Sequence, residues 1–65
     1  MKQKFPYQIS SGDAIISESG LQEIVDGVKM FNRNENLYEI RLRVGKAFSK
    51  LYVRGTKKIF VLNCN

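Results

Sequence analysis

Histidine is absent from this chain of 65 residues, and cysteine occurs once, at Cys64. Histidine is the commonest general base and the commonest metal ligand, so its absence removes the usual starting point for catalysis and for metal binding. A single cysteine cannot form a disulfide within the chain, and a lone thiol is typical of a reducing compartment. We therefore expect a cytoplasmic protein with no metal and no other cofactor.

Long apolar runs are also missing, and no stretch approaches the roughly 20 residues that a membrane-spanning helix needs. The first residues, MKQKFPYQISSGD, contain lysines but no apolar stretch after them, unlike a secretory signal. A chain of this length forms one domain at most, residues 1–65, and its core is modest. We expect a soluble domain without a membrane partner, which a homodimer or another protein would help to stabilise.

Acidic residues are nearly absent from the second half of the chain. Residues 36–65 carry seven Lys or Arg side chains against Glu39 alone, whereas residues 1–35 carry four cations and five anions. A charge asymmetry of this size gives a small domain a directed electrostatic field and favours anionic partners. Nucleic acid and acidic protein surfaces are both candidates.

No arrangement of residues predicts an enzyme. Glu23 and Asp26 share one face of an expected helix, but no histidine or second cluster accompanies them, so a solvated helix face is the better interpretation. The serines have no base to activate them. We expect binding without catalysis.

The segment from Ser19 to Asn32 has the spacing of an amphipathic helix. Its apolar residues recur at intervals of three and four along one stripe: Leu21, Ile24, Val25, Val28 and Phe31. Ser19 and Gln22 fit a capping box at its start. The asparagines of residues 32–36 can take the left-handed conformation that ends a helix.

The next segment, Leu37–Val44, alternates without interruption between apolar and polar residues, which predicts a half-buried strand. Gly45 and Lys46 suit a two-residue type II′ turn. A hairpin then pairs Val44 with Ala47 and continues with the pairs 42–49, 40–51 and 38–53. This register places the apolar residues of both strands on one face, which supports it.

A competing interpretation makes Lys46–Arg54 a short helix, because Val44, Ala47, Phe48 and Leu51 also fit helical spacing. The fold would then resemble a small winged DNA-binding domain. We prefer the strand, since no N-cap residue precedes the segment and Phe, Tyr and Val favour strands.

Two further strands, Lys4–Ile9 and Lys57–Asn63, complete the expected sheet, and one more short segment is a candidate strand. Lys4–Ile9 alternates Phe5, Tyr7 and Ile9, but the proline at position 6 limits it to an edge. Ala14–Ile16 is a candidate short strand after a turn. Lys57–Asn63 is apolar on both parities, and its register stays open, so either Ile59 or Phe60 faces away from the core.

Together these elements predict an α+β domain of two layers. One helix, Ser19–Asn32, packs on an antiparallel sheet made of a three-stranded meander, Leu37–Asn63, and an N-terminal edge strand. The helix carries acidic residues on its solvent face, and the sheet carries basic residues on the face turned away from the helix.

The outer face of this sheet is the predicted binding site, because it combines cations with aromatic rings. Cations neutralise phosphates, and bases of single strands stack on flat rings. The predicted residues are Arg41, Arg43, Lys46, Phe48, Lys50, Tyr52, Arg54 and Lys58. Nucleic acid, single-stranded by preference, is the first candidate partner.

An acidic protein surface is the second candidate, with the aromatic residues as a central anchor and the arginines around them. The chain would then act as an inhibitor or adaptor, for example of an enzyme that processes nucleic acid. A homodimer that pairs these faces is also left open.

Overall fold

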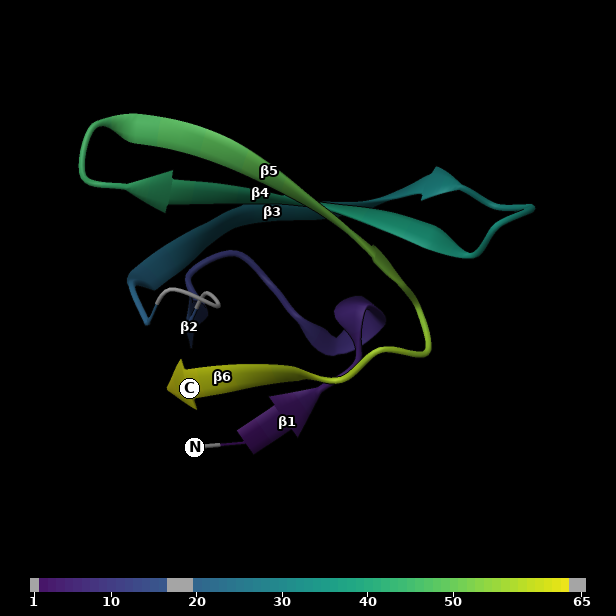
Figure 1. Ribbon diagram of the computed structural model, residues 1–65, viewed down its shortest axis with the longest axis horizontal. Helices are drawn as coiled ribbons and strands as arrows, with labels where there is room; N and C mark the ends of the chain where they lie inside the picture. The colour runs from purple at the N-terminus through teal and green to yellow at the C-terminus, as the bar shows by residue number, and fades with distance from the viewer. Residues whose placement is uncertain (1, 17–19, 64–65) are drawn as a thin grey trace.

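The computed structural model describes residues 2–16 and 20–63, which form a single six-stranded sheet in which all neighbouring strands are antiparallel. The order across the sheet is β1-β6-β2-β3-β4-β5 (Figure 1). The strands are β1 (Lys2–Lys4), β2 (Ala14–Ile16), β3 (Gln22–Asn32), β4 (Leu37–Val44), β5 (Ala47–Arg54) and β6 (Ile59–Asn63), and a 3₁₀ turn, η1 (Pro6–Gln8), follows β1. Within the described ranges η1 is the sole helical element, so the protein is all-β.

The predicted helix Ser19–Asn32, and with it the α+β class, is wrong. Residues 22–32 form the longest strand, β3, which pairs with β2 on one side and β4 on the other. Ser19, the expected N-cap, lies outside the described residues. The antiparallel sheet itself is confirmed, but no helix of the described chain covers it.

An irregularity in β3 explains why its sequence imitates a helix. The pairing with β4 shifts between Val25 and Gly27, as in a β-bulge, where two residues of one strand oppose one of its neighbour. Val25 pairs with Leu42 and Val28 with Ile40, so the two valines face the core although they are three residues apart. Three residues is a helical interval, and the bulge produces it within a strand.

The hairpin prediction is confirmed in full. Strands β4 and β5 pair Val44 with Ala47, and the register continues through 42–49, 40–51 and 38–53 as expected. Gly45 has a φ of +59°, and Lys46 is not in the positive-φ region, as a type II′ turn requires. Since residues 47–54 form a strand, the winged interpretation with a helix at Lys46–Arg54 is wrong.

The predicted N-terminal strand is correct only in its position at a sheet edge. Strand β1 ends at Lys4, and the proline at position 6 begins η1 because its ring fixes φ and removes a hydrogen-bond donor. Ile9 is buried and Tyr7 is exposed, so the expected alternation over residues 4–9 does not occur. The short strand at residues 14–16 is confirmed as β2.

The last strand does not continue the meander, so the predicted three-stranded meander Leu37–Asn63 is wrong. Strand β6 pairs with β1 and β2 instead of β5, and the true meander is β3-β4-β5. Ile59 and Val61 are buried, whereas Phe60 is exposed. The open question of register is thus settled with Phe60 away from the core, and β6 is not a neighbour of the basic hairpin.

The sheet curls so that β3, β4 and β5 lie over β6 and β1, and the core fills the space between these two halves (Figure 1). Its members are aliphatic: Ile9, Ile15, Val25, Ile40, Leu42, Val53, Ile59 and Val61. Of the seven aromatic residues in the chain, five are exposed: Tyr7, Phe31, Phe48, Tyr52 and Phe60. Most of the aromatic side chains therefore stay outside the core, although Tyr38 packs against it.

The turn between β3 and β4 touches the turn after β5. The Gly55 amide donates to the Asn36 carbonyl oxygen at 2.8 Å, and Asn36 has a φ of +53°. A Cβ atom placed on Gly55 would lie 2.6 Å from Oδ1 and 2.9 Å from Cγ of Asn36. Only glycine allows the two turns to come this close.

We predict that Gly55→Ala lowers the free energy of unfolding by about 1–3 kcal/mol, because the Asn36 side chain must move. Gly27→Ala is the matched control, since its Cβ would meet Arg41 only at an ordinary 3.7 Å. Urea denaturation measures both. Adding Asn36→Gly to Gly55→Ala should restore most of the loss, and equal stability of the two alanine variants would contradict the close contact.

Candidate nucleic-acid interface

The side of β3, β4 and β5 that faces away from the core, here called the outer face, carries most of the predicted binding residues. Its side chains follow from the alternation of β4 and β5 and from their register with β3. Its charged and aromatic members are Lys29, Phe31, Glu39, Arg41, Arg43, Phe48, Lys50, Tyr52 and Arg54. Cations outnumber anions on this face, as the sequence predicts.

Cross-strand pairing brings aromatic and basic side chains together on this face. Arg43 lies opposite Phe48, and Arg41 lies opposite Lys50. A shallow hollow of about 340 Å³ is lined by Arg41, Phe48 and Lys50 together with Asp26 and Ser49. Phe48 is the most exposed of the large apolar side chains, at 70%. Its ring is therefore available to a flat ligand.

Glu39 is the buried centre of the outer face, since the residue is only 3% exposed. Tyr52 donates its hydroxyl to Glu39 Oε1 at 2.9 Å, and two lysines surround the carboxylate. Lys29 Nζ lies 3.5 Å from Oε2, and Lys50 Nζ lies 3.8 Å from Oε1. Burial by itself would raise the pKa of Glu39, but the Tyr52 hydrogen bond and the two lysine charges outweigh it, so the pKa lies below its ordinary value.

The side chain of Tyr52 is fixed by contacts with Glu39 and Phe31, so it is less available to a ligand than the sequence suggests. Its hydrogen bond to Glu39 raises the pKa of the phenol, and burial adds to that effect. Its ring also meets the ring of Phe31 edge-on, with 4.9 Å between centroids. Tyr52 thus supports the outer face, and Phe48 is the ring of the predicted site that is open to stacking.

The structure brings together seven of the eight predicted site residues on one hairpin. Lys46 lies in the turn at its tip, and Arg54 lies at its other end, where Nη1 donates to the Glu35 carbonyl oxygen at 3.1 Å. Lys58 does not join them. It precedes β6, and its Nζ lies 5.5 Å from the centroid of the Phe5 ring.

Sequence reasoning missed the contribution of β3, because that segment was expected to be a helix. Lys29 and Phe31 reach Glu39 and Tyr52 from β3. Gly27 lies opposite Arg41, and a Cβ there would lie 3.7 Å from the Arg41 Nη2, so the guanidinium extends over the bare backbone. A glycine within a run of β-branched residues is a signal of a bulged strand that could have revealed this.

Among residues 2–16 and 20–63, no group of three or more potential ligands could hold a metal ion. In the same ranges every buried side-chain nitrogen or oxygen has a hydrogen-bond partner. No helix of the described chain is long and apolar enough to cross a membrane.

Compared with protein-family models, with curated protein sequences and with solved structures, the chain has no match.

The lowered pKa of Glu39 predicts an acid-sensitive fold. A carboxylate whose pKa is lower in the folded state stabilises the protein above its unfolded pKa of about 4.3, and that contribution is lost as the pH falls through the folded value. The pKa of Tyr52 is raised in the folded state, so the stability that this group contributes is present below its unfolded pKa and is lost as the pH rises above about 10.

We expect Glu39→Gln to be less stable than the wild type at pH 7 and to lose less stability between pH 5 and pH 3. Urea denaturation at several pH values measures this difference. Asp26→Asn removes the same charge from an exposed site and serves as the control. If the free energy of unfolding of Glu39→Gln fell as steeply between pH 5 and pH 3 as that of the wild type, the role of Glu39 would be refuted.

Proposed function

We propose that the protein binds single-stranded nucleic acid through the outer face and catalyses no reaction. The observation that carries this proposal is the exposed Phe48 ring beside Arg43, next to the hollow that Arg41 and Lys50 line. A base stacks on such a ring whatever its identity, and the neighbouring cations neutralise the phosphates on either side.

The cations of the hairpin differ in how freely they can meet a phosphate. Lys29 and Lys50 already share the Glu39 carboxylate. Within the described part of the chain, Arg41, Arg43 and Lys46 form no ion pair. These three are the side chains that we assign to phosphate contacts, since no internal anion competes for them.

Single strands fit this surface better than duplexes do. Stacking on Phe48 requires a base whose face is open, and bases in a duplex are already stacked. The described residues include no helix that could enter a major groove. We expect little sequence specificity, because a base stacks on Phe48 whatever its identity.

A protein with an acidic surface is the second candidate partner for this face. Phe31 and Phe48 are exposed on the same face as arginines, and aromatic rings with arginine are enriched at interaction hot spots. An inhibitor or adaptor of this kind would bind nucleic acid weakly, so the same titration separates the two functions.

We predict that the purified protein binds labelled single-stranded RNA or DNA more tightly than duplex DNA. Phe48→Ala should weaken this binding about 5- to 100-fold, the range that corresponds to one stacked base. Tyr7→Ala removes another exposed ring, 62% exposed, on η1 and outside the outer face, and should have little effect. Fluorescence anisotropy measures the affinities, and unchanged binding by Phe48→Ala with an intact fold would rule out stacking.

A second prediction concerns the phosphate contacts. Affinity should fall steeply with salt, and Arg43→Ala should reduce the slope of log K against log salt by about 0.7, the value for one contact to a single strand. Lys2→Ala removes one charge from β1, at the opposite edge of the sheet, and should leave the slope unchanged. Equal slopes for the wild type and Arg43→Ala would exclude Arg43 as a phosphate contact.

A further inference from the structure

Strand β5 is an unprotected edge of the sheet. It runs over eight residues and pairs with β4 alone, since the sheet order ends with it. The opposite edge, β1, has only three residues, of which two are lysines. Edge strands expose unpaired backbone groups and can accept another strand.

The register identifies which backbone groups of β5 are free. Residues beside a two-residue turn form a hydrogen-bonded pair, and bonded and non-bonded pairs then alternate along the hairpin. The Gly55 amide donates to the Asn36 carbonyl oxygen, which fixes the same alternation at the other end. The backbone groups of residues 47, 49, 51 and 53 are therefore directed to β4. Those of Phe48, Lys50 and Tyr52 point to the open edge, as does the amide of Arg54, whereas the Arg54 carbonyl oxygen accepts the Lys57 amide at 3.0 Å.

The core side of β5 is also uncovered. Ser49 and Leu51 have the parity of the buried Val53, yet both are exposed, Leu51 at 37%. On β4 the neighbouring core residues Ile40 and Leu42 are fully enclosed. Edge strand β5 thus carries core-side side chains, Ser49 and Leu51, that the described chain covers only in part.

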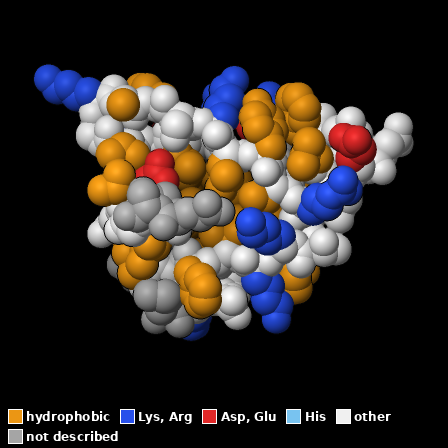
Figure 2. All heavy atoms as spheres, viewed as in Figure 1, with side chains coloured by type: hydrophobic (Ala, Val, Ile, Leu, Met, Phe, Trp, Pro, Cys, Tyr) orange, Lys and Arg blue, Asp and Glu red, His pale blue; other side chains and the backbone are white. Residues whose placement is uncertain are grey.

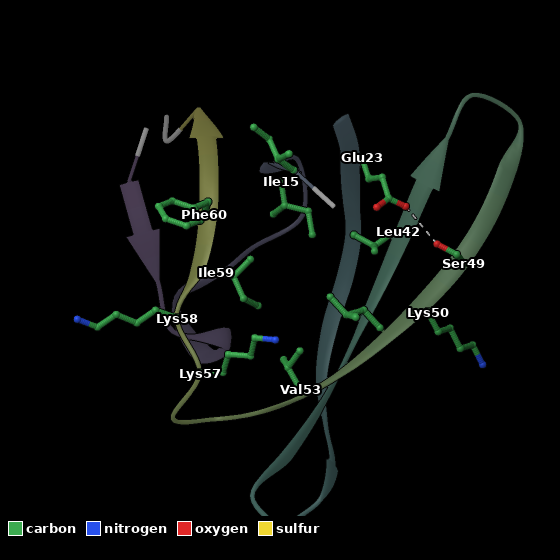
Figure 3. Close-up of a pocket in the computed structure, with 12 residues that line it drawn as sticks. Ile15, Glu23, Leu42, Ser49, Lys50, Val53, Lys57, Lys58, Ile59 and Phe60 are labelled. Atoms are coloured by element: carbon green, nitrogen blue, oxygen red, sulfur yellow. Dashed lines mark hydrogen bonds between the residues drawn. The ribbon is translucent and has the colours of Figure 1, made fainter. Parts of the chain in front are cut away.

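A pocket of about 540 Å³ lies beside this edge, between β5 and β6. Figure 3 shows Val53, Ile59 and Leu42 directed into it, with Lys57 extending across one end and Glu23 bonded to Ser49 at the other. Figure 2 shows the same region from outside as apolar side chains between the two halves of the sheet, with Lys and Arg side chains nearby. A strand placed along β5 could insert apolar side chains here.

The basic side chains around β5 favour an acidic sequence in a strand that is added there. On the outer face its side chains would lie beside Lys50 and Arg54, and Lys57 stands at the mouth of the pocket. Opposite charges across neighbouring strands are favourable, whereas like charges are not. A second copy of this chain would bring Lys50 and Arg54 near their own counterparts, in a protein whose net charge is already +5.

We propose that the free edge of β5 accepts an extended acidic segment of a partner protein as a seventh strand. Apolar residues of that segment alternate with Asp or Glu. The apolar ones face Ser49, Leu51 and Val53 and enter the pocket, and the acidic ones pair with Lys50 and Arg54 on the outer face. Backbone hydrogen bonds at the edge supply affinity that is independent of sequence.

Hydrogen exchange tests this proposal at single residues. The probe is a synthetic peptide of about seven residues, with glutamate alternating with valine or isoleucine and with both ends blocked. Binding should protect the amides of Phe48, Lys50, Tyr52 and Arg54 against exchange. The amides of residues 49, 51 and 53 are already bonded to β4 and should change much less. A peptide of the same composition with its glutamates clustered at one end is the control.

Two variants sharpen the test. Leu51→Gln removes an apolar contact in the pocket, and Lys57→Glu reverses the charge at its mouth. Each should weaken peptide binding, Lys57→Glu by up to about fivefold, the range of one exposed ion pair. Lys2→Glu makes the same charge change at the far edge and should alter the affinity less. Nucleic-acid binding by Leu51→Gln should match the wild type, because Leu51 does not lie on the outer face.

Three results would overturn the proposal. The first is the absence of protection in β5 at millimolar peptide. The second is protection by the clustered peptide equal to that by the alternating one. The third is protection of the four outward amides that rises with protein concentration in the absence of peptide, since a second copy would then occupy the edge.

Discussion

The unbroken pairing of β4 with β5 is the constraint on which the rest of the structure depends. Because side chains alternate along both strands, a single register places Ile40 and Leu42 in the core and Arg41 and Arg43 on the outer face. A shift by one residue would bury the arginines and expose the core. The same pairing therefore determines the stability of this small domain and the composition of its candidate binding surface.

The same alternation explains which parts of the fold can be predicted from the sequence and which cannot. Wherever the alternation is regular, as in β4 and β5, the register and the outward-facing side chains were predicted correctly. Where β3 contains a bulge, Val25 and Val28 face the core at an interval that also fits a helix, and the prediction failed. Because this segment was predicted as a helix, the predicted site did not include Lys29 and Phe31. Local periodicity alone cannot distinguish a bulged strand from a helix. The glycine between the two valines is a sequence signal that favours the bulged strand.

The position of β6 in the sheet cannot be predicted from local sequence patterns, for a different reason. A strand that is apolar on both parities fits several neighbours equally well, and the choice depends on contacts between distant segments. Ile59 and Val61 are buried in the core from β6, which lies between β1 and β2. That arrangement removes β6 from the meander and leaves β5 as a free edge. The pocket beside β5 is thus a consequence of where the last strand pairs.

Strand β5 takes part in both proposed interactions, and this links them. Its side chains Phe48, Lys50 and Arg54 face outward, while the backbone amides of the same residues point to the open edge. An acidic strand added there would place its carboxylates beside Lys50 and Arg54, where they would repel a phosphate backbone on the outer face. Each ligand would then weaken the other to the same extent, because coupling between two binding sites is reciprocal. If both interactions occur, an acidic partner segment would therefore release nucleic acid from this protein without touching Phe48.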